Sequence, residues 1–260
     1  MRRVLAPAKL TLSLSVTGVR PDGYHELRAE MVSVSLCDEL TFTEGSSGLT
    51  FHSEVGTRAG SLAAGGGNLI TRALAAVGRQ AAVHVVKRIP LGGGLGGGST
   101  DAAAVLRWAG CSDPDLARAL GSDVPFSVLG GRALVEGTGE RVTPLPFEPR
   151  QFLLLVPPFG VDTARVYAAW DELAGTDDSD GPRNALTEAA LRVEPRLAAW
   201  RDALGEHCGR VPRLAGSGST WFTEESAPDA GHEDDGWLRV GEARARLMRT
   251  HTVPAGWEGD

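Results

Sequence analysis

The amino-acid sequence predicts an α+β fold made of two domains, residues 1–148 and 149–260. The first residues have the pattern of consecutive antiparallel strands, whereas a doubly wound parallel sheet would start with a strand and then a helix. Strand and helix patterns are mixed on both sides of residue 148. A chain of 260 residues is long enough to bury a core in each half.

In the first half, three short stretches alternate polar and apolar side chains, the period of two that is typical of half-buried strands. They cover residues 10–16, 31–36 and 40–43, and the turn-forming run 20–23 follows the first. Asn68 can cap a helix that runs to about Val77. The other elements expected in this half are a strand at 82–89, a helix from Ser99, a short helix at 115–120 and a strand at 132–135.

In the second half, the apolar run 152–156 predicts a buried strand, which two prolines end. Helices are expected at 162–173 and 184–205, and a glycine turn is expected at 216–219. The stretches 175–181 and 224–236 are acidic and poor in apolar residues, so we expect them to be surface loops.

Composition and charge exclude several classes of protein. The net charge is −7 and the pI is about 5.4, so the chain as a whole offers no basic surface to a nucleic acid. No apolar run approaches the roughly 18 residues that a membrane span requires. Three cysteines without metal-ligand spacing suggest reduced thiols. We therefore expect a cytoplasmic protein, a monomer or a weak homodimer, that binds neither nucleic acid nor membrane.

The segment from Pro90 to Asp101 is rich in glycine, with six glycines in the seven positions from Gly92 to Gly98. Such a backbone reaches positive φ and lets a ligand approach closely. A helix that begins at Ser99 would point its free N–H groups at the loop, an arrangement that binds phosphate. The expected phosphate contacts are Pro90, Gly92, Gly93, Gly94, Leu95, Gly96, Gly97, Gly98, Ser99 and Thr100.

Three other interpretations of this loop compete. A flexible linker is the simplest, but a strand and a helix flank the glycines closely. The spacing of Gly92, Gly94 and Gly97 also fits the dinucleotide fingerprint of dehydrogenases, which any polyglycine run satisfies. A Walker A loop is excluded because it needs lysine where Gly98 stands.

At these residues the sequence resembles the GHMP kinase superfamily, whose phosphate loop has the form P-x-x-x-G-L-G-x-S-S-A. Further blocks of that family are matched, in order, by Ala6-Pro7-Ala8-Lys9-Leu10, Asp22-Gly23-Tyr24-His25-Glu26-Leu27, Gly67-Asn68-Leu69-Ile70, Gly121-Ser122-Asp123-Val124-Pro125-Phe126 and Ala215-Gly216-Ser217-Gly218-Ser219. Within the superfamily they are most similar to the branch acting on 4-diphosphocytidyl-2-C-methyl-D-erythritol, in the non-mevalonate route to isoprenoid precursors. The resemblance implies ATP and substrate in a cleft between two domains, and phosphoryl transfer to the 2-hydroxyl of that alcohol.

The resemblance also implies the reacting groups. Asp123 matches the residue that accepts the hydroxyl proton, although it could equally cap the helix after it. Lys9 matches the lysine beside that carboxylate, although a lysine at a strand start is usually a solvated edge residue. Mg²⁺ is expected with ATP, and its protein ligands are left unassigned.

The implied substrate pocket rests on aromatic residues. Tyr24 would stack on cytosine and His25 would bond its polar edge, while Tyr167 would cover the other face or else pack in the core. Ser99 and Thr100 would contact phosphate or Mg²⁺, or cap the helix, and Asn68 would reach the adenine.

The sequence departs from the family pattern at two places. Thr11 stands where the family usually has asparagine, which affects the substrate contact expected there, and the stretch between Leu106 and Asp123 is about one helix shorter. These departures leave open a kinase for another small alcohol. An inactive nucleotide-binding homologue and a dehydrogenase are the remaining alternatives.

Overall fold

The computed structural model describes residues 1–54, 67–173, 184–225 and 236–259. The expected loop at 175–181 and most of the stretch 224–236 lie outside these residues. Within the described residues, no helix is both long and apolar enough to cross a membrane.

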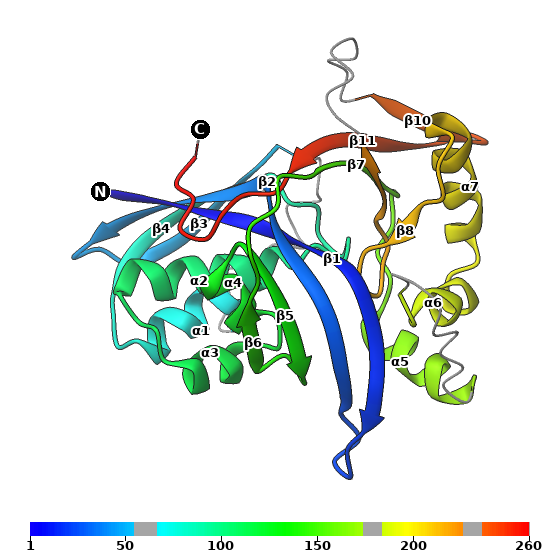
Figure 1. Ribbon diagram of the computed structural model, residues 1–260. Helices are drawn as coiled ribbons and strands as arrows, with labels where there is room; N and C mark the ends of the chain where they lie inside the picture. The colour runs from blue at the N-terminus through cyan, green and yellow to red at the C-terminus, as the bar shows by residue number, and fades with distance from the viewer. Residues whose placement is uncertain (55–66, 174–183, 226–235, 260) are drawn as a thin grey trace.

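The first sheet is built around one long strand, β2 (His25–Glu44), which pairs antiparallel with β1 (Arg2–Val19) along almost its whole length. Its other edge pairs with β4 (Ala81–Lys87) at one end and β5 (Arg132–Gly137) at the other. Two outer strands, β3 (Gly48–Ser53) and β6 (Arg141–Pro144), complete the order β3-β4-β2-β5-β6. The long β1–β2 hairpin stands between the two groups of helices (Figure 1).

The strands expected at 31–36 and 40–43 are one strand, so the break predicted between them was wrong. Asp38 lies in the predicted break and is fully buried, because its carboxylate pairs with Lys87. Strands β3 and β6 were not expected from the sequence.

Four helices pack against the first sheet, and their apolar side chains form a core with those of the sheet. They are α1 (Leu69–Ala76), α2 (Gly97–Ala109), α3 (Pro114–Leu120) and α4 (Val124–Leu129). Helix α2 begins two residues before the expected start, since Gly96 adopts positive φ and ends the loop there. The short link after α2 leaves it well packed: Trp108 stacks on Phe42, with ring centroids 4.7 Å apart.

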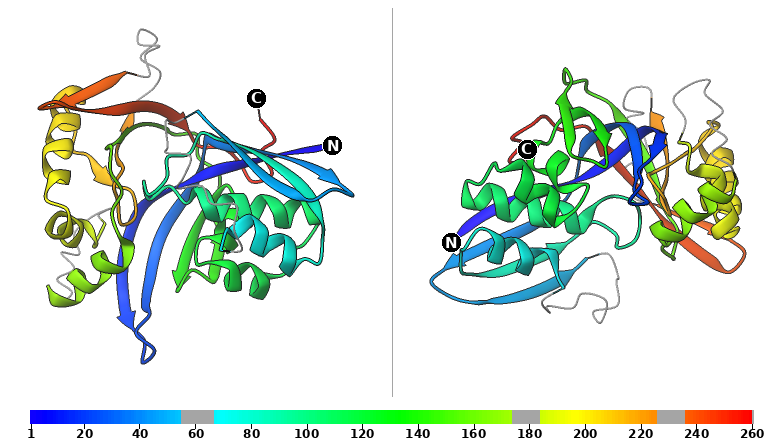
Figure 2. Two further views of the ribbon diagram at one scale, coloured as in Figure 1. Left: turned by 180° about the vertical axis from the view of Figure 1, so that it is seen from behind. Right: turned by 90° about the horizontal axis from the view of Figure 1, so that it is seen from below.

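The second sheet has the order β10-β11-β7-β9-β8. Its strands are β7 (Gln151–Val156), β8 (Arg213–Leu214), β9 (Trp221–Glu225), β10 (Trp237–Val240) and β11 (Ala243–His251), of which only β7 was expected. Three helices lie beside this sheet, as the views in Figure 2 show: α5 (Thr163–Glu172), α6 (Thr187–Val193) and α7 (Arg196–Cys208). The single helix predicted at 184–205 was therefore wrong, because Pro195 cannot continue the α6 hydrogen bonds and begins a new helix.

The α+β class is confirmed, and the two sheets share part of their core. Side chains of β1 such as Leu14 and Val16 pack with Leu153 and Trp221 of the second sheet. The chain passes from one sheet to the other between Pro144 and Gln151. The boundary at residue 148 falls in this connection and stays a prediction.

A buried cluster of three charges ties the glycine loop to the first sheet. The Lys87 ammonium at the end of β4 contacts the carboxylates of Asp38 in β2 and Asp101 in α2. Asp38 also accepts hydrogen bonds from the backbone N–H groups of Arg88 and Ile89, at 2.6 and 2.8 Å. These bonds fix the chain just before the loop begins.

Two carboxylates share one ammonium in this cluster, so one of them has reason to hold a proton. Burial raises the pKa of Asp101 to about 7; the charge of Asp38 adds to this effect and Lys87 opposes it. One oxygen of Asp101, Oδ1, has no hydrogen-bond partner among the described residues. The ionised form of Asp101 therefore destabilises the folded state.

We predict that Asp101→Asn makes stability less dependent on pH. A carboxyl whose pKa is near 7 when folded and about 4 when unfolded stabilises the fold at low pH and loses that effect as pH rises through 7. From pH 5 to pH 8, urea unfolding should favour the variant over the wild type by a further 1–3 kcal/mol, on the order expected for a partly compensated buried charge. The exposed Asp115→Asn serves as control. A difference that is constant with pH would contradict the prediction.

Candidate active site

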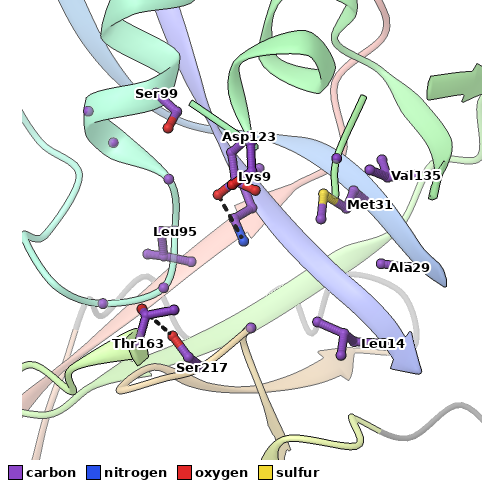
Figure 3. Close-up of a pocket in the computed structure, with 18 of the residues that line it drawn as sticks. Lys9, Leu14, Ala29, Met31, Leu95, Ser99, Asp123, Val135, Thr163 and Ser217 are labelled. Atoms are coloured by element: carbon purple, nitrogen blue, oxygen red, sulfur yellow. Dashed lines mark hydrogen bonds and ion pairs between the residues drawn. The ribbon is translucent and has the colours of Figure 1, made fainter. Parts of the chain in front are cut away.

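A cavity of about 350 Å³ lies between β1, the glycine loop, the start of α4 and the turn after β8. Its lining includes Lys9, every residue from Pro90 to Ser99, Asp123 and Ser217. Figure 3 shows Lys9 and Asp123 facing each other, with Ser99 on α2 on one side and Thr163 and Ser217 across the cavity. An apolar wall of Leu14, Ala29, Met31 and Val135 closes a further side.

The glycine loop is held against β1 and the second sheet by backbone contacts. The carbonyl of Leu95 accepts from the N–H of Lys9 at 3.1 Å, and that of Gly93 accepts from the N–H of Thr220 at 3.2 Å. Gly94 has φ of 76°, and a Cβ there would lie 2.2 Å from the carbonyl oxygen of Ala215. Only glycine permits both this conformation and this approach.

The loop ends where α2 begins, and this junction exposes backbone donors. Gly96 has φ of 71° and makes no side-chain cap, so the first N–H groups of α2 are left without an intrahelical partner. They belong to Gly97, Gly98 and Ser99, because the N–H of Thr100 already donates to the carbonyl of Gly96. The helix dipole adds partial positive charge at the same place, so the junction is suited to an anion.

The two hydroxyls next to the loop have different surroundings. Thr100 is buried, donates to the carbonyl of Gly97 at 3.0 Å and is not among the residues that line the cavity. Ser99 lines the cavity. Of the two predicted phosphate or Mg²⁺ contacts, the structure therefore places only Ser99 where a ligand could meet it.

Lys9 and Asp123 form the charged centre of the cavity. The Lys9 ammonium lies 3.4 Å from Oδ2 of Asp123, and their side chains are 8% and 28% exposed. Asp123 stands at the N-cap position of α4, but its side chain makes no capping hydrogen bond. Capping is thus excluded as the role of this carboxylate in the structure, and the alternative of a solvated strand-edge lysine is excluded for Lys9.

A local irregularity in β1 aims Lys9 into the cavity. The pairing register with β2 shifts between Pro7 and Ala8 and again between Thr11 and Ser13. Such bulges redirect side chains in a sheet. Between the two shifts, the backbone N–H of Lys9 bonds the glycine loop, and its ammonium donates to the hydroxyl of Thr11 at 3.2 Å.

That bond bears on the predicted substrate contact at Thr11. The residue is buried and does not line either cavity of the site. Its hydroxyl accepts a hydrogen bond from the Lys9 ammonium. Thr11 therefore acts on the site through Lys9 in this structure.

A second, more open cavity of about 850 Å³ adjoins the first. Both are lined by Leu27, Ser122, Thr138 and Tyr167. The larger one also includes the predicted base-binding residues Tyr24 and His25. Its charged residues are Arg20, Asp22, Asp115, Arg118 and Asp171.

His25 and Tyr167 come from different halves of the chain and meet in this cavity. Their rings are tilted by 31° with centroids 4.7 Å apart, and the ring of Trp170 meets His25 edge-on at 5.5 Å. Nε2 of His25 lies 2.8 Å from Oδ1 of Asp171. Burial and the charge of Asp123 raise the pKa of Tyr167, so its phenol stays neutral.

Several residues of the two cavities were not expected from the sequence. They include Arg118, Thr163, Asp171 and Ser217, of which Thr163 and Ser217 share a hydrogen bond of 2.8 Å. Asp171 could have been found, because it follows Tyr167 by four residues on a predicted helix and so lies on the same face. Asn68, predicted to reach adenine, caps α1 by accepting from the N–H of Ile70 and lines neither cavity; that role stays a prediction.

The expected metal has no ready-made cage. Within the described residues, no group of three or more histidine, cysteine or acidic side chains could hold an ion. Mg²⁺ binds kinase sites through one or two protein groups and the phosphates of its nucleotide. Ser99, one of the predicted Mg²⁺ contacts, lines the smaller cavity.

Comparison with known proteins agrees with this geometry. Residues 68–131 match the family model of the GHMP kinases N terminal domain. The 4-diphosphocytidyl-2-C-methyl-D-erythritol kinase of Pelotomaculum thermopropionicum is 37% identical, over 84% of this chain and 87% of that protein. The kinase of the same name from Salinispora arenicola is 39% identical, over 88% of this chain and 85% of that one.

Solved structures give the same result. A crystal structure of 4-(cytidine 5'-diphospho)-2C-methyl-D-erythritol kinase matches with a TM-score of 0.71 and 34% identity, covering 97% of this chain and all of that one (100%). A crystal structure of L. major mevalonate kinase matches with a TM-score of 0.68 but only 12% identity, covering 98% of this chain and 96% of that one, which shows the shared fold. The similarity of sequence and structure extends over nearly the whole length, and the chain belongs to the 4-diphosphocytidyl-2-C-methyl-D-erythritol kinase family of the GHMP kinases.

Proposed function

We propose that this protein transfers the γ-phosphoryl group of ATP to the 2-hydroxyl of 4-diphosphocytidyl-2-C-methyl-D-erythritol. The observation that carries the proposal is the pair of Lys9 and Asp123, 3.4 Å apart, in one cavity with the N-terminus of α2. A carboxylate there can take up a proton, and the unpaired N–H groups can hold phosphate oxygens.

The roles of the two charged residues follow from what phosphoryl transfer requires. The protein positions the reactants and stabilises charge on the transferred group, and the attacking hydroxyl must lose its proton. Asp123 accepts that proton. Lys9 pairs with this carboxylate and faces the negative charge on the transferring oxygens. Thr11 holds the ammonium in place.

ATP would enter with Mg²⁺, which neutralises phosphate charge when bound. Ser99 would be its contact on the protein side, since its side chain lines the cavity next to the start of α2. The glycines of the loop present no side chains to the phosphates. Gly94 packs so closely on Ala215, and Gly96 on Lys9, that a side chain would not fit at either position.

The two adjoining cavities suit the two ends of the proposed acceptor. The apolar wall of the smaller cavity suits the carbon skeleton of the methyl-erythritol near Asp123. The larger cavity offers Tyr24, His25 and Tyr167 to a planar base. A diphosphate between these ends would pass the shared residues Ser122 and Thr138.

The proposal is tested by ATP consumption with the cytidyl alcohol as acceptor, run beside mevalonate and homoserine. We expect turnover with the cytidyl compound alone, because only that acceptor fills both cavities. Folded protein that turns over mevalonate or homoserine instead, with Mg²⁺ present, would sink the proposal.

We predict that Asp123→Asn removes most turnover while ATP affinity stays nearly unchanged. The amide keeps the size of the side chain but cannot accept the proton, a loss of about 10²–10⁴-fold in kcat. Steady-state rates and calorimetric titration with an ATP analogue measure the two effects. Near-normal turnover would mean that this carboxylate takes no proton in the reaction.

We further predict that Arg118→Gln weakens binding of the diphosphate substrate. Arg118 lines the larger cavity, and its guanidinium pairs with none of the residues that the structure describes. Loss of a charge-assisted bond should raise KM for the cytidyl substrate by about tenfold or more, with kcat and KM for ATP unchanged. Arg201→Gln, on α7 and paired with its neighbour Asp202, is the matched control. An unchanged KM would remove Arg118 from the substrate site.

A further inference from the structure

The contact between His25 and Asp171 joins the two halves of the protein inside the larger cavity. His25 begins β2, and Asp171 lies in the last turn of α5. Nε2 of His25 is 2.8 Å from Oδ1 of Asp171, and the two side chains are 10% and 49% exposed. The rings of Tyr167 and Trp170 flank the imidazole, so its plane is fixed on two sides.

This contact decides which nitrogen of the imidazole carries the proton. A carboxylate can only accept hydrogen bonds, so Nε2 must be the donor. In the neutral ring, the other nitrogen, Nδ1, is then a bare acceptor. Because Asp171 accepts from Nε2, Nδ1 of His25 is left to accept a hydrogen bond from a donor on a bound ligand.

A pyrimidine base offers different donors depending on its identity. The edge of cytosine carries one donor, the amino group on C4, beside two acceptors. Uracil has a carbonyl oxygen in place of that amino group and an N–H donor in place of the acceptor N3, so an acceptor that faces the substituent on C4 is repelled by uracil. An imidazole fixed with a bare Nδ1 can therefore bond cytosine and must reject the uracil oxygen at that position.

We propose that Asp171 is a positioning residue that sets the tautomer of His25 and thereby makes the site select cytosine over uracil. The proposal rests on the proposed function, because it concerns the base of the cytidyl substrate. Tyr24 and Tyr167 supply stacking, which favours neither pyrimidine. Selectivity is therefore assigned to the His25–Asp171 pair, with one residue from each half of the chain.

The first test observes the tautomer directly. In protein labelled with ¹⁵N-histidine, long-range ¹H–¹⁵N correlation distinguishes the nitrogens of the six histidines, and His25→Gln assigns the signal. We expect His25 to carry its proton on Nε2, with a proton signal at low field that exchanges slowly with water. In Asp171→Ala this slow exchange should be lost. A wild-type His25 protonated on Nδ1 alone would overturn the proposal.

The second test measures base preference by binding, without turnover. Cytidine 5'-diphosphate and uridine 5'-diphosphate are titrated calorimetrically with a saturating non-hydrolysable ATP analogue present, which occupies the glycine loop. The wild type should bind the cytidine compound about tenfold or more tightly, as expected for a bond whose loss leaves a polar group unpaired. Asp171→Ala should lose about tenfold of that preference, and Asp171→Glu should restore most of it.

Glu172→Ala is the matched control, since Glu172 is the next residue of α5 and pairs with Arg192 away from His25. Its base preference should equal that of the wild type. An Asp171→Ala variant that keeps the full preference, as folded as the control by thermal unfolding, would overturn the proposal. Absent turnover of the cytidyl alcohol, with the preference intact, would count against the proposed function and not against this inference.

Discussion

The ATP half of the site depends on a buried ammonium, that of Lys87. An ammonium inside a protein must be paired, because removing it from water costs several kcal/mol unless carboxylates replace the lost hydration. Asp38 and Asp101 supply this pairing from β2 and α2, so the charge brings together a strand, the end of another strand and a helix. Asp38 then uses its other oxygen to hold the backbone at Arg88 and Ile89. The glycine loop is thus held at its start by Asp38 and at its end by the helix that contains Asp101, while Leu95 packs into an apolar core between them.

The reacting half of the site depends on how closely the loop approaches Lys9. A Cβ on Gly96 would lie 2.7 Å from Cγ of Lys9, and one on Gly216 would lie 3.4 Å from its ammonium. Lys9 is therefore confined between the loop of the first half and the glycine turn of the second. Asn184 fixes that turn by donating to the carbonyl oxygens of Leu214 and Gly216, at 2.9 and 2.5 Å. The Lys9 ammonium is therefore placed by both halves of the chain, and β1, which carries Lys9, also packs with the second sheet.

The sequence predicted the reactive groups, but it did not predict the residues that hold those groups in position. The phosphate loop, Lys9, Asp123 and His25 lie in short blocks whose chemistry is legible, and the structure brings them into two adjoining cavities. The break predicted inside β2 was wrong, because the pairing with β1 resumes at Cys37 after a register shift and Asp38 is held by Lys87, far along the chain. Likewise Asp171 has an ordinary helical position, and its meeting with His25 depends on how α5 packs on the first half. Long-range pairing of charges leaves no local pattern.

The acidic character of the chain constrains how it can bind anions. With a net charge of −7, the protein repels ATP and a diphosphate at long range, so attraction must come from groups at short range. The N–H groups of α2 add partial positive charge without adding a cation, and Lys9 is balanced by Asp123. Around the larger cavity, Arg20 is already paired with Asp22, at 2.8 Å. Among the described residues of that rim, Arg118 is thus the arginine with charge left for a ligand, and binding there should weaken with salt far more steeply than binding at the glycine loop.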